Sequence, residues 1–363
     1  MTELQRIAIA EESELGYVEV VRSAFVPGAP VRPNMMQNVI LGLLLGLGFG
    51  IGAAFLKEAM NTRLRHPEDI EAKGYTLLGV VPTMAPEIQE AFDGHDFIEL
   101  EGHRVSTRLM PLLNPWSSIT ENYRLIQTNL KNAEEDEPHT LVITSAEEKE
   151  VKTVTSVNMA LTGALSGQRV LLIDADMRKP SAHDMIGMPR SPGLADVLST
   201  MPQTNGHSPN FVQQSSSDTN DLSVDSYIHR TPIDGLYFIP AGVTESAPSK
   251  MLDSGRFQQL VESTQEHFDL VVIDTPPTQA ASDSVVIGSQ IESKILVVSA
   301  DESDSRALDS AMGALRTVGA DVAGVVLNRY AEDKVREESA YDYSYYRAED
   351  YYEYREEKEA EMA

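Results

Sequence analysis

The chain has 363 residues, a formal net charge of −27 at pH 7 and no cysteine. This negative charge argues against sequence-independent binding of nucleic acid, because a phosphate backbone needs a basic surface. The absence of cysteine excludes disulfides, zinc sites made of cysteine and thiol nucleophiles. At this length we expect one large domain with shorter segments attached to it.

A membrane helix is expected at residues 35–57. The run from Val39 to Leu56 is uncharged, and its 18 residues would rise about 27 Å as a helix, close to the thickness of a bilayer's hydrocarbon core. A buried core helix is the alternative, but the five glycines of the run would weaken a soluble helix and are tolerated in membranes. The basic residues after the run favour the cytoplasm for the C-terminal side: Lys57, Arg63, Arg65 and Lys73.

The segments around this helix and at the C-terminus carry weaker patterns. Residues 1–34 lie before the helix, on the expected outer side, and are too few to form a core. Residues 58–116 are expected to be a juxtamembrane segment and linker, because residues 84–115 show little regular pattern. Residues 331–363 hold 12 acidic and 5 basic residues and seven of the chain's 13 tyrosines, with no apolar period, so we expect a disordered tail.

Strands and helices are expected to alternate through residues 117–330. This alternation predicts an α/β fold with a parallel sheet covered by helices on both faces. A polar stretch at residues 203–231 interrupts the pattern and is expected to be a flexible surface insertion. The expected strands are 140–145, 169–173, 236–240, 270–273, 294–299 and 322–327, and the expected helices are 117–132, 153–165, 256–266, 280–288 and 306–318.

Three motifs follow expected strands and together predict a nucleotide site. Lys152-Thr153 has the place of a P-loop Lys-Thr, whose amine reaches the outer phosphates and whose hydroxyl binds magnesium. Asp174 and Asp176 end a second strand, and Asp274 ends a third in the manner of a Walker-B motif. Each motif alone is weak, because an aspartate after a strand often only caps a helix or forms a turn. In this order they predict a site at the carboxyl edge of the sheet. We expect magnesium near Thr153, Asp174 and Asp274, and catalytic roles for Lys152, Asp174 and Asp176.

The motifs resemble, in order, the second membrane helix and kinase domain of bacterial tyrosine kinases that are fused to polysaccharide chain-length regulators. The proline-rich segment Pro27–Pro33 and the stretch Asn61–Ile70 match the two sides of that membrane helix. Further matches are Leu78–Pro82, Lys179–His183, Pro192–Leu198, Pro240–Gly242, Ser282-Asp283 and Gly324–Asn328.

The resemblance implies a P-loop NTPase-like fold and a membrane-anchored autokinase. Such a protein uses ATP and Mg²⁺ to phosphorylate the tail of a neighbouring copy, and so controls polymerisation and export of extracellular or capsular polysaccharide. It would cross the bacterial inner membrane once, with its N-terminus outside. The implied phosphoacceptors are Tyr341, Tyr343, Tyr345, Tyr346, Tyr351, Tyr352 and Tyr354; alternatively, the tail is a solvated interaction segment.

The family also implies self-association and partners. Its ring-forming helix carries a Glu-x-x-Arg-x-x-Arg pattern, which here reads Glu121, Arg124 and Gln127, and the alternative for the first two is a surface ion pair. Besides a homo-oligomer and the membrane, the expected partners are a polysaccharide polymerase or export machinery. Residues 1–34 would be the remnant of a chain-length-determinant domain, whose missing part is a separate subunit or was lost by a shortened frame. No nucleic acid is expected.

The loop before Lys152 departs from the family pattern Pro-Gly-Glu-Gly-Lys. Glu148 replaces the proline, and Lys149 and Val151 replace the glycines that allow positive φ and close approach to phosphate. The carboxylates of Glu147, Glu148 and Glu150 would also repel an anion. Residues 149–154, Lys149, Glu150, Val151, Lys152, Thr153 and Val154, are the expected nucleotide-binding stretch.

Two functions of different class therefore remain open. The first is a tyrosine autokinase, supported by Lys152-Thr153, the aspartates and the tail tyrosines. The second is a non-catalytic co-polymerase scaffold of the same fold that binds ATP weakly or not at all. A partitioning ATPase of related fold is disfavoured by the expected membrane helix.

Overall fold

The computed structural model describes Gly28 and residues 34–59, 61–134, 138–201, 224–244, 247–253, 255–291 and 293–331. The chain forms two units, Met1–Asn61 and Thr62–Ala363, which we describe separately. The expected N-terminal remnant, most of the 203–231 insertion and the tyrosine tail lie outside the described residues.

The first unit contains one long helix, α2 (Met35–Ala59). Its apolar side chains are exposed on every side, from Met35 to Leu56, and the first charged residue within α2 is Lys57. A helix that is apolar all round is suited to lipid. The stretch Met35–Glu58 is long and apolar enough to cross a membrane, so α2 is a candidate membrane span.

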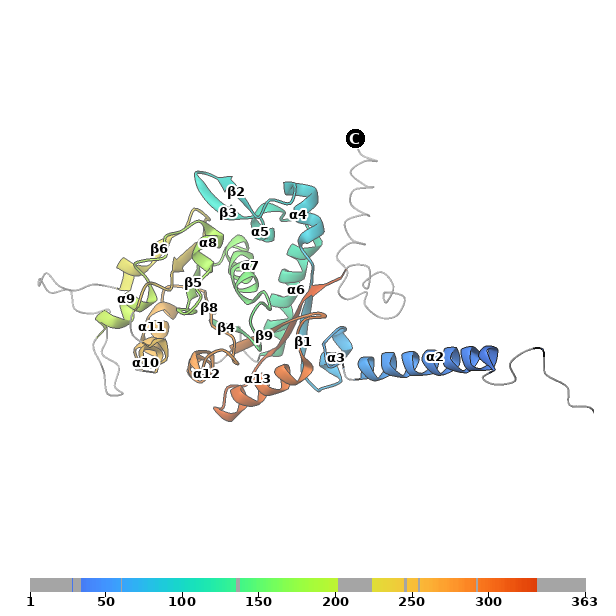
Figure 1. Ribbon diagram of the computed structural model, residues 1–363. Helices are drawn as coiled ribbons and strands as arrows, with labels where there is room; N and C mark the ends of the chain where they lie inside the picture. Colours follow the sequence, from blue (N-terminus) through green and yellow to red (C-terminus); the bar gives the residue numbers. More distant parts are fainter. Residues whose placement is uncertain are drawn as a thin grey trace, which may run out of the picture. The chain divides into compact units, whose positions relative to one another are not determined.

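The second unit is built on an eight-stranded sheet in the order β1-β10-β9-β4-β8-β5-β7-β6 (Figure 1). All neighbouring strands are parallel except β6, which runs antiparallel to β7. This confirms the expected parallel α/β fold. The strands are β1 (Leu77–Pro82), β4 (Thr140–Ser145), β5 (Val170–Asp174), β6 (His229–Arg230), β7 (Leu236–Ile239), β8 (Leu270–Asp274), β9 (Ser293–Ser299) and β10 (Gly324–Tyr330).

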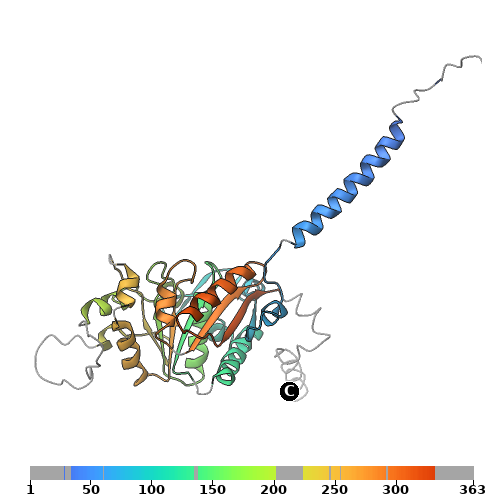
Figure 2. The same cartoon turned by 90° about the horizontal axis from the view of Figure 1, so that it is seen from below.

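Helices cover both faces of this sheet, because alternate side chains of each buried strand enter opposite cores. In β4, Leu141 and Ile143 pack into one core and Val142 into the other. Figure 1 shows the two layers, and Figure 2, seen from below, shows α13 in front of the strands. One layer contains α4 (Ala85–Phe92), α5 (Met110–Leu113), α6 (Ser118–Ala133), α7 (Lys152–Leu165) and α8 (Ala182–Ile186). The other contains α3 (Pro67–Glu71), α9 (Leu194–Thr200), α10 (Pro248–Leu252), α11 (Arg256–Gln265), α12 (Asp283–Gly288) and α13 (Ser305–Thr317).

The prediction that residues 84–115 form a linker is wrong, because this stretch is folded onto the domain. It forms α4, α5 and a hairpin of β2 (Phe97–Leu100) and β3 (His103–Ser106), and Val105, Leu109 and Met110 are fully buried. Its elements span four to eight residues, too short to show a period in the sequence. The domain begins near Thr62, because α3 and β1 also belong to it.

The predicted insertion at residues 203–231 also contains regular structure near its C-terminal end. Its last residues form a 3₁₀ turn, η1 (Val224–Tyr227), and the edge strand β6. The polar composition of this stretch gave no sign of these two short elements, of which β6 pairs with β7.

Gly193 should be a stability-critical position. Its backbone is extended, and a Cβ there would lie 2.1 Å from the Pro240 carbonyl oxygen and 2.6 Å from the Gly242 nitrogen. Gly193→Ala should lower the free energy of unfolding by about 1–3 kcal/mol, because backbone atoms must move to admit the methyl group. Gly313→Ala in α13, where nothing lies within 4 Å of the added Cβ, is the control and should be neutral or stabilising. Urea denaturation of both variants checks this, and equal unfolding midpoints would contradict it.

Candidate nucleotide-binding site

The expected site residues meet at the carboxyl edge of the sheet. The strands β4, β8 and β5 are neighbours, and Asp174 lies opposite Asp274 in the register of β5 and β8. After β4 the chain makes a short loop and enters α7 at Lys152. The structure thus brings Lys152, Thr153, Asp174, Asp176 and Asp274 to one place, as the parallel topology requires.

The loop keeps a glycine-like backbone without glycine. Lys149 has φ of 71°, and Val151, the N-cap of α7, has φ of 61° and ψ of 23°. These are the two positions where the family pattern has glycine. A β-branched side chain at positive φ costs about 1–3 kcal/mol, so other interactions must hold Val151 in this conformation.

Lys152 lies buried among carboxylates. Its Nζ donates to Asp274 Oδ1 at 2.9 Å and lies 3.6 Å from Asp176 Oδ2. Thr153 and Ser156 donate their hydroxyls to Asp274, each at 2.8 Å. Burial alone would lower the pKa of Lys152, but the nearby carboxylates, Asp274 first, outweigh it and raise this pKa. Lys152 therefore stays charged.

Asp174 and Asp176 have different surroundings. Asp174 is fully buried, and its oxygens accept from the backbone nitrogens of Asp176 at 3.2 Å and Ala182 at 3.3 Å. Burial, together with the charge of Asp274, raises the pKa of Asp174 to about 8. Asp174 thus holds the turn after β5, whereas Asp176 lines the pocket.

The three glutamates that were expected to repel an anion each have a partner. Glu148 binds Lys179 Nζ with both oxygens at 2.7 Å, and this contact lowers the pKa of Glu148. Glu150 accepts from the Ser303 hydroxyl and from the Glu147 backbone nitrogen. Glu147 itself accepts from the Asp304 backbone nitrogen at 3.4 Å. The repulsion expected from sequence is therefore partly offset.

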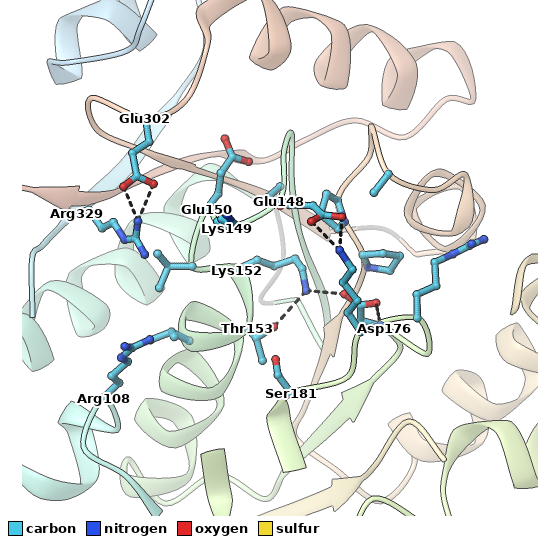
Figure 3. Close-up of a pocket in the computed structure, with 18 residues that line it drawn as sticks. Arg108, Glu148, Lys149, Glu150, Lys152, Thr153, Asp176, Ser181, Glu302 and Arg329 are labelled. Atoms are coloured by element: carbon cyan, nitrogen blue, oxygen red, sulfur yellow. Dashed lines mark hydrogen bonds and ion pairs between the residues drawn. The ribbon is translucent and has the colours of Figure 1, made fainter. Parts of the chain in front are cut away.

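A pocket of about 800 Å³ opens over the loop and the start of α7 (Figure 3). Figure 3 shows Arg108 and Arg329 to one side of Lys152, and Asp176 to the other. Cations outnumber carboxylates in its lining, which suits a polyphosphate. The cations are Arg108, Lys149, Lys152, Arg178, Lys179 and Arg329, and the carboxylates are Glu148, Glu150, Asp176 and Glu302.

Sequence reasoning missed several of these cations. Arg108 lies between β3 and α5, in the stretch that was expected to be a linker, and no local pattern marks it. Arg329 lies two residues beyond the expected end of its strand, and its guanidinium binds Glu302. Arg178 lies between the expected Asp176 and the matched stretch Lys179–His183, but its contact with Asp283 at 2.7 Å could not be predicted from spacing.

Magnesium fits part of the expected ligand set. Within the described residues, no group of three or more His, Cys, Asp or Glu is arranged to hold a metal. Magnesium needs only one or two protein ligands when water and phosphate supply the rest. The Thr153 hydroxyl and the Asp274 carboxylate, 2.8 Å apart, suit that role once Asp274 exchanges a side-chain donor for the metal. Asp174 instead accepts from the backbone with both oxygens and so holds the turn after β5.

The remaining expected site residues lie elsewhere. Glu121 and Arg124 form an i,i+3 ion pair at 2.9 Å on α6, with both side chains partly exposed. Val154 lines the pocket from the first turn of α7. The seven tail tyrosines lie outside the described residues.

Comparison with known proteins finds matches in two separate parts of the chain. Residues 1–59 match a family profile described as "G-rich domain on putative tyrosine kinase", and residues 142–303 match an AAA domain. Tyrosine-protein kinase etk of Escherichia coli (strain K12) is 29% identical over 350 residues, 93% of this chain and 44% of etk. The chain is thus similar to bacterial tyrosine kinases of the polysaccharide chain-length family.

Other bacterial tyrosine kinases give the same result. Tyrosine-protein kinase wzc of Salmonella typhi is 26% identical over 344 residues, 94% of this chain and 44% of wzc. The chain therefore spans less than half the length of these relatives. The kinase domain of Escherichia coli ETK aligns with a TM-score of 0.62 at 26% identity, covering 74% of this chain and 96% of that domain. The BceF tyrosine kinase domain gives 0.57 at 26% identity, covering 73% and 98%.

These likenesses confirm a nucleotide-binding class of fold. Together with α2, the similarity to bacterial tyrosine kinases supports a membrane-anchored protein.

Removing the amine of Lys152 should destabilise the domain in a pH-dependent way. Lys152→Met leaves Asp274 and its neighbours without their buried counter-ion, at a cost of about 2–4 kcal/mol at pH 8. The cost should shrink at pH 5, because the unpaired carboxylates take up protons more readily in the folded state. Urea denaturation at both pH values tests this, with the exposed Lys250→Met as control. A loss that is equal at pH 5 and pH 8 would show that the carboxylates are not the cause.

The buried carboxyl of Glu150 should also make stability depend on pH. Burial raises the pKa of Glu150 from 4.5 to about 7, so the folded state binds this proton more tightly than the unfolded chain. The contribution of the Glu150 carboxyl to the free energy of unfolding is therefore complete below pH 4.5 and is lost as the pH rises to about 7. Glu150→Gln should gain about 1–3 kcal/mol relative to wild type between pH 4.5 and pH 8. Denaturation across this range checks it. Glu90→Gln, at an exposed position, should show no such gain.

Proposed function

We propose that this protein is a membrane-anchored protein-tyrosine autokinase that transfers the γ-phosphate of ATP to tyrosines in the tail of a second copy. The observation that carries this proposal is the loop before α7. It has positive φ at Lys149 and Val151 and presents Lys152 and Thr153 beside Asp176 and Asp274. A loop of this shape can offer its backbone N–H groups to phosphate at a helix N-terminus.

Each group at the site has a role in this proposal. Lys152 would leave its carboxylates to bind the outer phosphates of ATP. Thr153 and Asp274 would hold Mg²⁺, which neutralises phosphate charge when bound. The tyrosine oxygen forms a bond to the γ-phosphorus as the bond from that phosphorus to the ADP oxygen breaks. The phenolic proton passes to Asp176, the pocket-facing carboxylate. Asp174 keeps the turn that positions Asp176.

The setting follows from the family and from α2. We place α2 in the bacterial inner membrane, with the N-terminus outside and the kinase domain in the cytoplasm. The protein would form homo-oligomers through the surface of α6 that carries Glu121 and Arg124. It would regulate polymerisation and export of extracellular or capsular polysaccharide with a chain-length subunit or polymerase. Each phosphate adds about −1.5 to −2 charges to the tail, so phosphorylation would make neighbouring tails repel one another.

Titration of the full chain in detergent with ATP and Mg²⁺ tests the kinase proposal. We expect saturable binding in the micromolar range or tighter, and phosphotyrosine at residues 341–354 by mass spectrometry. Thr153→Ala should weaken binding about tenfold or more, because a hydroxyl that faces phosphate and metal is lost. Thr317→Ala, which removes an exposed hydroxyl at the end of α13, is the control. No saturable binding up to millimolar ATP would support a non-catalytic scaffold instead.

A further inference from the structure

The side chain of Glu150 bonds back to the loop that contains it. We call this loop, residues 146–151 between β4 and α7, the phosphate loop. The Glu150 side chain is nearly buried, with 3% exposed, and it lies between Lys149 and Val151, the two residues at positive φ. One carboxylate oxygen accepts from the Glu147 backbone nitrogen at 2.7 Å, and the other accepts from the Ser303 hydroxyl. The first bond closes a ring within the loop, and the second ties that ring to the segment between β9 and α13.

Ser303 is fixed as a donor to Glu150. Its side chain is buried, and its Oγ accepts from the Ser299 backbone nitrogen at 2.8 Å. Its one hydroxyl proton is donated to Glu150 Oε1. The backbone of Ser303 is held as well, because its carbonyl accepts from the Leu64 nitrogen at 2.9 Å.

A second pair of hydrogen bonds also connects the loop to the segment between β9 and α13. Glu147, at the start of the loop, accepts from the backbone nitrogen of Asp304, and the Asp304 carboxylate accepts from the Thr62 hydroxyl at 2.7 Å. The loop is thus bonded at both ends to residues 303–304. Those residues are bonded in turn to residues 62–64, at the very start of the domain.

We propose that Ser303, acting through Glu150, is a positioning residue that holds the phosphate loop in its binding shape in place of the missing glycines. Glycine reaches positive φ without steric cost, whereas Lys149 and Val151 need an outside constraint. The buried hydrogen bond from Ser303 supplies that constraint from a neighbouring segment that is itself hydrogen-bonded to Ser299 and Leu64. The inference rests on the proposed nucleotide binding for its affinity readout, but the shape of the loop can be measured without nucleotide.

The role of Ser303 makes a non-additive prediction. If Ser303 only filled space, its loss would have the same effect in any loop. If it replaces glycine, it should become dispensable once Lys149 and Val151 are changed to glycine. The experiment therefore compares four full-length proteins in detergent: wild type, Ser303→Ala, Lys149→Gly with Val151→Gly, and the triple variant.

Mg²⁺-ATP affinity is the first readout. Ser303→Ala should weaken binding about tenfold or more in the native loop and by about twofold or less in the glycine loop. Ser310→Ala, at an exposed position in α13, should change neither loop. Equal weakening in both loops would overturn the proposal. If Ser303→Ala does not fold, Ser303→Cys in the same two loops replaces it, because a thiol is a weak donor of nearly the same shape, with the same contrast expected and the same result overturning it.

Hydrogen exchange of the loop amides is the second readout and needs no nucleotide. Ser303→Ala should speed exchange at residues 147–152 about tenfold or more relative to Ser310→Ala, because the loop opens more often. Unchanged exchange would overturn the positioning role. If wild type bound no ATP while exchange responded as expected, the kinase proposal would fail and the positioning role would stand.

Discussion

The buried contact between Lys152 and Asp274 fixes where α7 begins relative to the sheet. Asp274 ends a central strand, and its carboxylate receives Lys152, Thr153 and Ser156 from the first turns of α7. A buried carboxylate is costly unless it is paired and hydrogen-bonded, so these three donors must stay close to it. The loop before α7 is confined in consequence, because it must join β4 to a helix start that these three donors hold against β8.

This confinement explains why the loop can keep a glycine-like shape. Its two ends are set by β4 and by α7, and between them the chain must turn sharply within a few residues. The steric cost at Lys149 and Val151 is local, whereas the contacts that oppose it come from β8, from the segment after β9 and from Lys179. Strained backbone persists in proteins where the surroundings over-determine it. Here the surroundings are polar side chains that the sequence places far from the loop.

The sequence predicted the parallel sheet and the meeting of the motifs because both follow from short-range patterns. Residues 140–145 form an apolar run followed by polar residues, and the strand has those bounds. Parallel topology then brings Lys152, Asp174 and Asp274 together without any further information. The partners of the loop were not predictable in this way. Glu148 meets a lysine 31 positions away, and Glu150 meets a serine 153 positions away. No periodicity connects such residues, and Arg108 was hidden in elements too short to show one.

The substitutions in the loop bear on function through their partners rather than through their charge alone. Unpaired carboxylates facing the pocket would repel phosphate strongly, because the site is partly shielded from water. Glu148, however, is neutralised by Lys179 at the rim, and Glu150 is nearly buried and engaged by Ser303 and the Glu147 nitrogen. The anion therefore meets Lys149, Lys152 and Arg108 at the pocket with less opposing charge than the loop sequence implies. If the loop had lost its glycines without any compensation, burying the Glu150 side chain at its centre would not stabilise it. The buried and fully bonded Glu150 indicates that the loop is held in one shape, and a fixed shape is what phosphate binding requires.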